Sequence, residues 1–291
     1  TVVWVLPMAY HFLVSIILYL RFGAAIAICR DFLADSILEM TNRFNGTLLY
    51  ASPMHIRLLA SDKSERKLPS LKRVISTSTA ISLHHCEAFK KRYGIDVSQA
   101  YGIIEIGLPI INLKKSAEHP DAVGNALPDY SVEMLDTNFD VLPPESIGKL
   151  AIQGPGMFDA YLNPPQLRGD ILKKGWFLTG DLAVKNKDGL ISICGREKSM
   201  INVSGNKVFP EEVEHVLLSH KAVHECKVSG TIHPLLGEIV MAKVILEKGM
   251  EISTEKLIEH CRMQLSTYKV PQILEFVTSL EMTGSGKVKR D

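Results

Sequence analysis

The sequence predicts an α/β protein. A mostly parallel sheet layered with helices is followed by a small β subdomain and then by a separate C-terminal α+β domain. Strand-like and helix-like segments alternate over residues 1–113, as they do in parallel sheets. Residues 114–196 are rich in Gly and Pro and contain short β runs without a long helix, which indicates a β-barrel-like subdomain, of barrel or sandwich type. Residues 197–291 mix helices and strands again, and we expect them to form a domain of their own.

The first region contains an apolar stretch that must be distinguished from a membrane span. Residues 12–29 are strongly apolar, but Arg21 interrupts them. The run before it is far shorter than the roughly 20 residues that a transmembrane helix needs. We therefore expect no transmembrane segment, a buried helix at 12–20 and a buried strand at 24–29. The other elements expected here are strands at 1–7, 47–51, 74–76 and 97–101 and helices at 31–43, 53–59 and 84–93.

The later regions are expected to contain shorter elements. In the β subdomain, the expected strands are 131–135, 148–153, 181–185 and 190–194. In the C-terminal domain, Pro210 suits the first position of a helix, where its missing N–H costs nothing. The side chains spaced to face inward on that helix are Val213, Val216 and Leu217. A strand at 239–246 and a final helix capped by Ser253 or Thr254 complete the prediction.

Composition excludes several classes of protein. The 291 residues are 46% hydrophobic and 22% charged, values of an ordinary globular protein. The net charge of +1 gives no reason to expect nucleic acid or an anionic membrane as a partner. The five cysteines are scattered and never form a C-x-x-C pair. We therefore expect neither a disulfide framework nor a zinc site, and a reducing cytoplasm as the location.

One stretch, residues 195–214, carries a long and specific motif. It reads G-R-E-K-S-M-I-N-V-S-G-N-K-V-F-P-E-E-V-E, an arginine after a glycine turn, a short strand, a second turn and a new helix. Many domain junctions have this form, so the arrangement of elements taken alone does not indicate a function. Its pattern G-R-x-K-x-x-I-x-V-S-G-x-K-V-x-P-x-E-V-E resembles the hinge of the adenylate-forming enzymes. That superfamily includes acyl-CoA synthetases, aryl-CoA ligases, luciferases and peptide-synthetase adenylation domains.

A second motif, S-Q-A-Y-G-I-I-E at 98–105, places an aromatic ring, a glycine and a carboxylate at the end of an expected strand. Ligands of open α/β sheets bind outside the carboxyl ends of strands. The motif resembles Y-G-x-T-E of the superfamily. The resemblance implies nucleotide contacts by Ala100, Tyr101, Gly102 and Ile103, with the Tyr101 ring at the adenine, and Mg²⁺ binding by Glu105. The family threonine that contacts phosphate is replaced by Ile104.

Two further segments match the nucleotide site of the superfamily. Residues 76–80, S-T-S-T-A, follow an expected strand where the family has a glycine-rich loop, which assigns Ser78, Thr79 and Ala80 to the nucleotide. The sequence T-G-D-L at 179–182 matches a family signature whose aspartate binds the ribose hydroxyls. An ionised carboxylate can accept hydrogen bonds from both hydroxyls. The resemblance therefore implies that Asp181 binds the ribose, and Arg196 matches the family arginine that also reaches it.

The remaining matches concern the acid, the thiol and domain motion. The tail T-G-S-G-K-V-K-R at 283–290 resembles T-x-S-G-K-x-x-R, whose lysine enters the active site, which makes Lys287 a catalytic candidate with Glu105. Lys198 matches the pivot of the last domain, and Ser204 and Gly205 the loop on the thiol side. P-M-A-Y-H at 7–11 resembles a segment of the acid pocket and assigns His11 to it. Residues 161–164, Y-L-N-P, resemble a structural turn, and we assign them no chemistry.

The resemblance implies an ATP-dependent carboxylic acid–thiol ligase that forms an acyl-AMP intermediate and then an acyl thioester. Its cofactors and partners would be ATP and AMP, Mg²⁺, a small-molecule carboxylic acid, and CoA or the phosphopantetheine of an acyl carrier protein. A non-catalytic relative that binds a nucleotide or a protein is the alternative. The family's Ser/Thr/Gly-rich phosphate loop does not occur in the sequence, so we expect the chain to be a fragment that does not adenylate alone.

Overall fold

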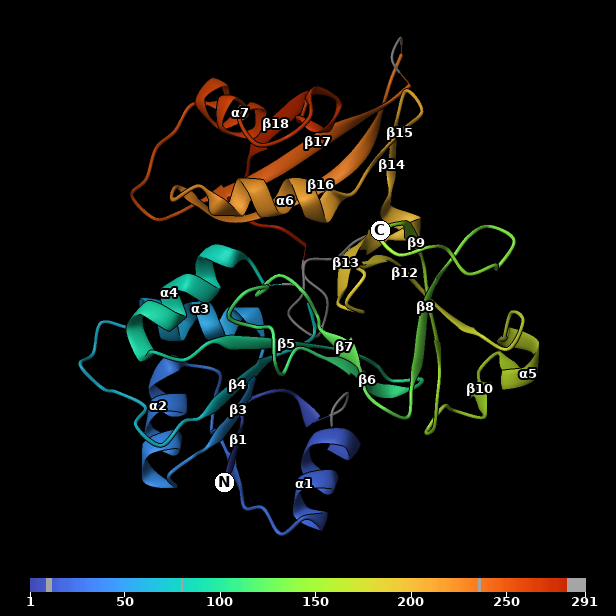
Figure 1. The fold of residues 1–291 in the computed structure, drawn as a ribbon. Coiled ribbons are helices and arrows are strands. Elements are labelled where there is room, and N and C mark those ends of the chain that lie inside the picture. The colour runs from blue at the N-terminus through green and yellow to red at the C-terminus, as the bar shows by residue number, and fades with distance from the viewer. Residues whose placement is uncertain (9–11, 80, 235–236, 282–291) are drawn as a thin grey trace. The chain divides into compact units, whose positions relative to one another are not determined.

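The chain forms two compact units in a computed structural model that describes residues 1–8, 12–79, 81–234 and 237–281 (Figure 1). Unit 1 comprises Thr1–Thr179 and Ala183–Ile193. Unit 2 comprises Gly180–Leu182 and the chain from Cys194 onward. Each unit has a hydrophobic core of its own, so the two are described in turn.

Unit 1 is built on a seven-stranded sheet in the order β2-β1-β3-β4-β5-β6-β7. The five strands from β2 to β5 run parallel to their neighbours, and β6 and β7 are antiparallel additions at one edge. The predicted mostly parallel sheet is thus confirmed. The strands are β1 (Val2–Trp4), β2 (Ile26–Ile28), β3 (Leu48–Ala51), β4 (Arg73–Ser76), β5 (Val97–Ile103), β6 (Gly107–Ile111) and β7 (Asn125–Ala126).

The two faces of this sheet carry separate apolar layers because successive strand residues point to opposite sides. Helices α2 (Ala34–Arg43), α3 (Pro53–Ser61) and α4 (Leu83–Tyr93) pack on one face, which contributes Val3, Leu49 and Val74. The other face contributes Trp4, Tyr50 and Ile75 and packs against the segment of α1 (Leu18–Arg21). Figure 1 shows α1 across the sheet from α2.

The segment at 12–20 corrects one prediction. It is helical, as a π-helical turn η2 (Phe12–Ile17) followed by α1, but it is not buried. Ser15 and Ile16 face the core, whereas Phe12, Leu18 and Leu20 are 44–51% exposed. Apolar composition predicts a helix but not how many of its faces are covered, and in the described chain only the Ile16 face packs against the sheet.

Two neighbouring boundaries also differ from the prediction. The strand expected to be buried at 24–29 is β2, an edge strand whose Ile28 is 47% exposed, because no described strand pairs with its outer side. Helix α2 begins at Ala34 rather than Asp31, since Oδ1 of Asp31 accepts a hydrogen bond from the Leu33 N–H and forms a turn instead. Among the described residues, no helix is both long enough and apolar enough to cross a membrane.

A four-stranded sheet in the order β13-β12-β9-β8 follows. Its strands lie close to the predicted positions, and β8 and β9 pair antiparallel. They are β8 (Ser131–Leu135), β9 (Ile147–Gln153), β12 (Phe177–Lys185) and β13 (Ile191–Arg196). A hairpin of β10 (Ala160–Leu162) and β11 (Pro165–Leu167), with α5 (Arg168–Ile171), is inserted between β9 and β12. Strands β12 and β13 lead from unit 1 into unit 2.

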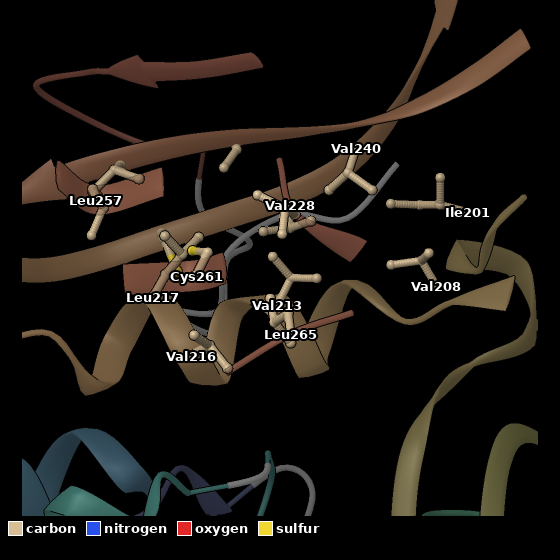
Figure 2. Close-up of a cluster of buried hydrophobic side chains, with 14 of the residues drawn as sticks. Ile201, Val208, Val213, Val216, Leu217, Val228, Val240, Leu257, Cys261 and Leu265 are labelled. Carbon is tan, nitrogen blue, oxygen red and sulfur yellow. The ribbon is translucent and has the colours of Figure 1, made fainter. Parts of the chain in front are cut away.

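Unit 2 packs two helices against a three-stranded sheet in the order β16-β17-β18. Figure 2 shows the cluster of buried apolar side chains of this unit, with Val213, Leu217, Val228 and Leu257 among them. Helix α6 (Pro210–Ser219) starts at the predicted proline and buries the three predicted apolar residues, while Ser253 caps α7 (Thr254–Arg262). The other elements are η3 (Glu197–Ser199), β14 (Ile201–Val203), β15 (Asn206–Val208), β16 (Val223–His233), β17 (Gly237–Leu246), η4 (Thr267–Lys269) and β18 (Ile273–Phe276). The predicted separate C-terminal α+β domain is therefore present.

Candidate functional site

The predicted nucleotide residues of unit 1 lie at the carboxyl ends of adjacent parallel strands. Strand β4 ends at Ser76, and the loop after it contains the exposed Ser78 and Thr79. Ser78 has a φ of +83°, in the left-handed region that glycine adopts most easily. A serine therefore stands here in a backbone conformation that favours glycine. Ala80 lies outside the described residues.

Strand β5 supplies the next group. Ala100 is buried, and the half-buried Tyr101 packs against the core beneath the four-stranded sheet. A Cβ on Gly102 would lie 2.7 Å from the carbonyl oxygen of Gly107, so only glycine allows β5 and β6 to approach this closely. The position of Gly102 is thus explained by local packing as well as by the motif.

Glu105 lies in the turn between β5 and β6 and is held by a distant segment. Its Oε1 accepts a hydrogen bond from the Tyr161 hydroxyl at 2.9 Å, and its carbonyl oxygen accepts one from the Phe158 N–H at 2.8 Å. Partial burial, and then the bond to Glu105, raise the pKa of Tyr161 to about 12, so its hydroxyl stays protonated at neutral pH. Sequence reasoning missed Tyr161, because 56 residues separate it from Glu105.

The chemistry of this carboxylate fits Mg²⁺ only in the presence of a substrate. The described residues contain no group of three or more His, Cys, Asp or Glu side chains placed to hold a metal ion. Mg²⁺ commonly binds through one or two carboxylates, with waters and substrate phosphates completing its octahedron. Glu105 fits this mode, and its Oε2 makes no hydrogen bond to the described part of the chain.

The side chain of Ile104 is directed to solvent, with 71% of its surface exposed. Because this aliphatic side chain stays exposed to water, it contributes little hydrophobic stabilisation to the fold. It also has no hydroxyl to donate to a phosphate, unlike the threonine of the family motif. Packing within the described residues therefore does not explain this isoleucine.

In unit 2 the structure brings together the two residues predicted to bind ribose. Asp181 follows Gly180, which has a φ of +79°, and its side chain is only 7% exposed. Nε of Arg196 lies 2.7 Å from Asp181 Oδ1, while the Arg196 side chain is 58% exposed. A buried carboxylate is thus paired with an arginine whose side chain is largely exposed. Such a pair combines oxygens that accept hydrogen bonds from hydroxyls with N–H groups that donate them.

The predicted hinge and thiol-side residues follow directly. Lys198 is exposed in the single turn of η3, between β13 and β14. Ser204 and Gly205, with φ of +50° and +86°, form the two-residue loop of the β14–β15 hairpin, as type I′ turns require. The Gly205 N–H donates to Oδ1 of Asn202 at 2.9 Å, which fixes the loop.

Two predicted residues besides Ala80, namely His11 and Lys287, lie outside the described residues. Unit 2 also contains an ion pair that the sequence did not indicate. Nζ of Lys269 lies 2.6 and 2.8 Å from the two carboxylate oxygens of Glu212, which joins η4 to α6. Burial, and then the charge of Glu212, raise the pKa of the nearby Cys194 thiol to about 11, so this thiol is not an activated nucleophile.

The fold and these motifs define a class of protein. A parallel sheet ends in the Tyr-Gly-x-x-Glu hairpin, and the Thr-Gly-Asp-Leu strand leads through a hinge into an α+β domain. The chain belongs to the adenylate-forming superfamily: the family described as "AMP-binding enzyme" matches residues 1–162, and "AMP-binding enzyme C-terminal domain" matches residues 212–287.

Three individual relatives have sequence identities of 27–31% to this chain. The acyl-coenzyme A synthetase ACSM3 of Rattus norvegicus, named as mitochondrial, is 31% identical over 269 residues, covering 89% of this chain and 46% of the relative. The crystal structure of ATP-bound MatB from Rhodopseudomonas palustris has a TM-score of 0.89 and 27% identity, and covers 99% of this chain and 58% of that one. The amide bond synthetase McbA from Marinactinospora thermotolerans has a TM-score of 0.82 and 28% identity, covering 90% and 55%. The chain spans about half the length of the curated relatives it matches.

Proposed function

We propose that this chain is part of an ATP-dependent carboxylic acid–thiol ligase of the acyl-CoA synthetase type. The observation that carries the proposal is the ion pair between the buried carboxylate of Asp181 and the guanidinium of Arg196, whose Nε lies 2.7 Å from Asp181 Oδ1. The pair lies where the superfamily motifs predict ribose binding. The names of the relatives, which include acyl-coenzyme A synthetases, support the acyl-CoA ligase type.

In the proposed reaction, a carboxylate oxygen of the acid attacks the α-phosphorus of ATP and pyrophosphate leaves, which gives acyl-AMP. The thiol sulfur of CoA then attacks the acyl carbon, AMP leaves, and the thiol proton passes to solvent. The protein contributes mainly positioning and charge stabilisation. In this scheme the ammonium of Lys287 offsets the negative charge that develops at the phosphorus, and Lys198 is the pivot between the two half-reactions.

Each part of the chain has a role in this proposal. Glu105 would hold Mg²⁺ together with phosphate oxygens, and the ion would offset phosphate charge. Asp181 and Arg196 would hold the ribose. The other proposed nucleotide contacts are Ser78, Thr79, Ala80, Ala100, Tyr101, Gly102 and Ile103. The loop of Ser204 and Gly205 would serve the thiol side, and His11 the acid pocket. We propose the corresponding domain division as 1–113, 114–196 and 197–291.

AMP binding tests the ribose assignment directly. Calorimetric titration of the protein as its gene encodes it should show Asp181→Ala weakening AMP binding about 10- to 100-fold, since hydrogen bonds to charged groups contribute roughly 1.5–3 kcal/mol. Asp188→Ala is the matched control, because Asp188 is an exposed carboxylate in the turn between β12 and β13. Equal AMP affinity in the wild type and Asp181→Ala would refute the assignment of Asp181.

Isotope exchange between pyrophosphate and ATP tests the ligase itself. We expect exchange that depends on an added carboxylic acid and that Lys287→Ala nearly abolishes. A panel of acids in this assay would identify the substrate. Release of AMP from the preformed acyl-AMP by free CoA supports CoA as the acceptor, whereas release only by a loaded carrier protein would assign phosphopantetheine instead. No acid-dependent exchange would refute the ligase.

One observation favours a second candidate, a non-catalytic relative that binds a nucleotide. The exposed Ile104 stands where the superfamily has a phosphate-contacting threonine. If this candidate is correct, AMP binds but exchange is absent, and Ile104→Thr does not raise it. If the ligase is correct, the same substitution should raise the exchange rate severalfold, by restoring one charge-assisted hydrogen bond.

The compartment is also a proposal. None of the five cysteines forms a disulfide, and all five lie within the described residues. This supports a reducing location such as the cytoplasm. Localisation of the tagged protein by microscopy and fractionation would test it.

A further inference from the structure

Tyr161 is bound to the proposed metal ligand from a separate part of unit 1. It lies on strand β10, and its hydroxyl donates to Oε1 of Glu105 at 2.9 Å. No motif of the superfamily named above requires this bond. The sequence alone assigned Tyr161 to a turn without chemistry, so the contact calls for an explanation.

The Tyr161 ring packs against another aromatic ring. Its centroid lies 4.6 Å from that of Phe158, and Phe158 in turn contacts the buried Phe177 edge-to-face at 5.8 Å. This chain of rings connects Tyr161 to the core beneath the four-stranded sheet. The donor hydroxyl is therefore carried by a ring that packs against another aromatic ring, although Tyr161 is 37% exposed.

The side-chain bond is not needed to attach the two segments. The Phe158 N–H already donates to the carbonyl oxygen of Glu105 at 2.8 Å, which joins the segment before β10 to the β5–β6 turn through the backbone. What the Tyr161 hydroxyl adds is control over the Glu105 side chain, which otherwise rotates about three bonds in a half-exposed turn. Fixing one oxygen of a ligand by a neighbouring hydrogen bond is a common way to orient it for a metal.

We propose that Tyr161 is a positioning residue that fixes one oxygen of Glu105 and so prepares the other for the Mg²⁺ that accompanies ATP. This inference rests on the proposed function, in which Glu105 binds Mg²⁺. It predicts an effect on the metal and none on the nucleoside.

The test measures how much Mg²⁺ strengthens ATP binding, by calorimetry on the protein as its gene encodes it, with Mg²⁺ or with a chelator. Tyr161→Phe keeps the ring contact with Phe158 and removes only the hydroxyl. We expect it to reduce the Mg²⁺-dependent gain in ATP affinity about fivefold, which corresponds to roughly 1 kcal/mol. AMP affinity and metal-free ATP affinity should not change.

Two further variants complete the design. Tyr130→Phe is the matched control: its hydroxyl also donates into the β5–β6 turn, to the carbonyl oxygen of Ile106 at 3.3 Å, but not to Glu105. It should leave the Mg²⁺ gain unchanged. Glu105→Gln should abolish most of the gain, and in that background Tyr161→Phe should have no further effect, as a double-mutant cycle requires of a residue that acts through Glu105.

The results separate failure of this inference from failure of the proposed function. An unchanged Mg²⁺ gain in Tyr161→Phe, or equal losses with and without metal, would overturn the positioning role while the Glu105→Gln result leaves the metal role standing. A full Mg²⁺ gain in Glu105→Gln with ATP still bound would overturn both the metal role of Glu105 and the inference built on it. If the wild type does not bind ATP at all, the proposed function itself is refuted.

Discussion

The buried histidine of unit 1 should make this chain sensitive to mild acid. His55 lies at the start of α3 and is 2% exposed. Its Nδ1 accepts a hydrogen bond from the Ser52 N–H at 3.1 Å and lies 2.7 Å from the Ser52 hydroxyl. The ring is therefore neutral, with its proton on Nε2, and burial lowers its pKa from 6.5 to about 4.

The sign and size of the effect follow from this depressed pKa. As the pH falls below 6.5, the unfolded chain takes up a proton at this residue before the folded chain does. The stability that neutral His55 provides is complete above that pH and is lost as the pH falls toward about 4. At about pH 5 the proton favours the unfolded state roughly 30-fold, which costs about 2 kcal/mol of unfolding free energy.

Urea unfolding followed by tryptophan fluorescence measures this cost. Both tryptophans, Trp4 and Trp176, lie in unit 1 with His55, so the signal reports the relevant unit. Between about pH 7.5 and about pH 5, the wild type should lose about 2 kcal/mol more than His55→Gln, which has no proton to take up. His119→Gln, at an exposed histidine of the same unit, should behave like the wild type. An identical loss in the wild type and His55→Gln would refute the reasoning.

Two further substitutions test local structure. Glu214 is buried and its Oε1 accepts the Val228 N–H at 2.9 Å, so Glu214→Ala should destabilise unit 2 by about 2 kcal/mol, with Glu214→Gln less affected. Amide hydrogen exchange of the Val228 peptide should accelerate, and unchanged exchange would contradict this. Ser78→Gly should raise the unfolding free energy of unit 1 by about 1 kcal/mol. The substitution removes the conformational strain of a serine at φ +83°, and this gain exceeds the extra backbone entropy that glycine gives the unfolded chain. A lower urea midpoint would be the contrary result.

Features that depend on neighbouring residues could be predicted from the sequence. Ser52 and Pro53 mark the start of α3, and they do so in the structure through a capping box with His55. Ser204 and Gly205 mark a hairpin turn because both positions need a positive φ. The motifs that include Glu105 and Asp181 are also short and continuous in the sequence. They indicated the superfamily without any knowledge of the tertiary structure.

Burial of the 12–20 segment could not be predicted in this way. Its apolar residues are compatible with a helix that is either fully or partly buried. How much of the helix surface is buried depends on which other elements pack against it. Ile16 faces the sheet and Leu20 faces outward, although both are aliphatic and four residues apart. The same holds for Ile28, whose exposure depends on its strand being at the edge of the sheet.

By itself, the sequence determined the fold class, the superfamily and the residues that are candidates for the nucleotide site. Only the tertiary structure decided which of these side chains meet. Arg196 contacts Asp181 because two strands of one sheet lead into unit 2, and Tyr161 reaches Glu105 across 56 residues of chain. Local propensity encodes the conformation of a few consecutive residues, whereas such contacts arise only when the cores of the whole chain have packed.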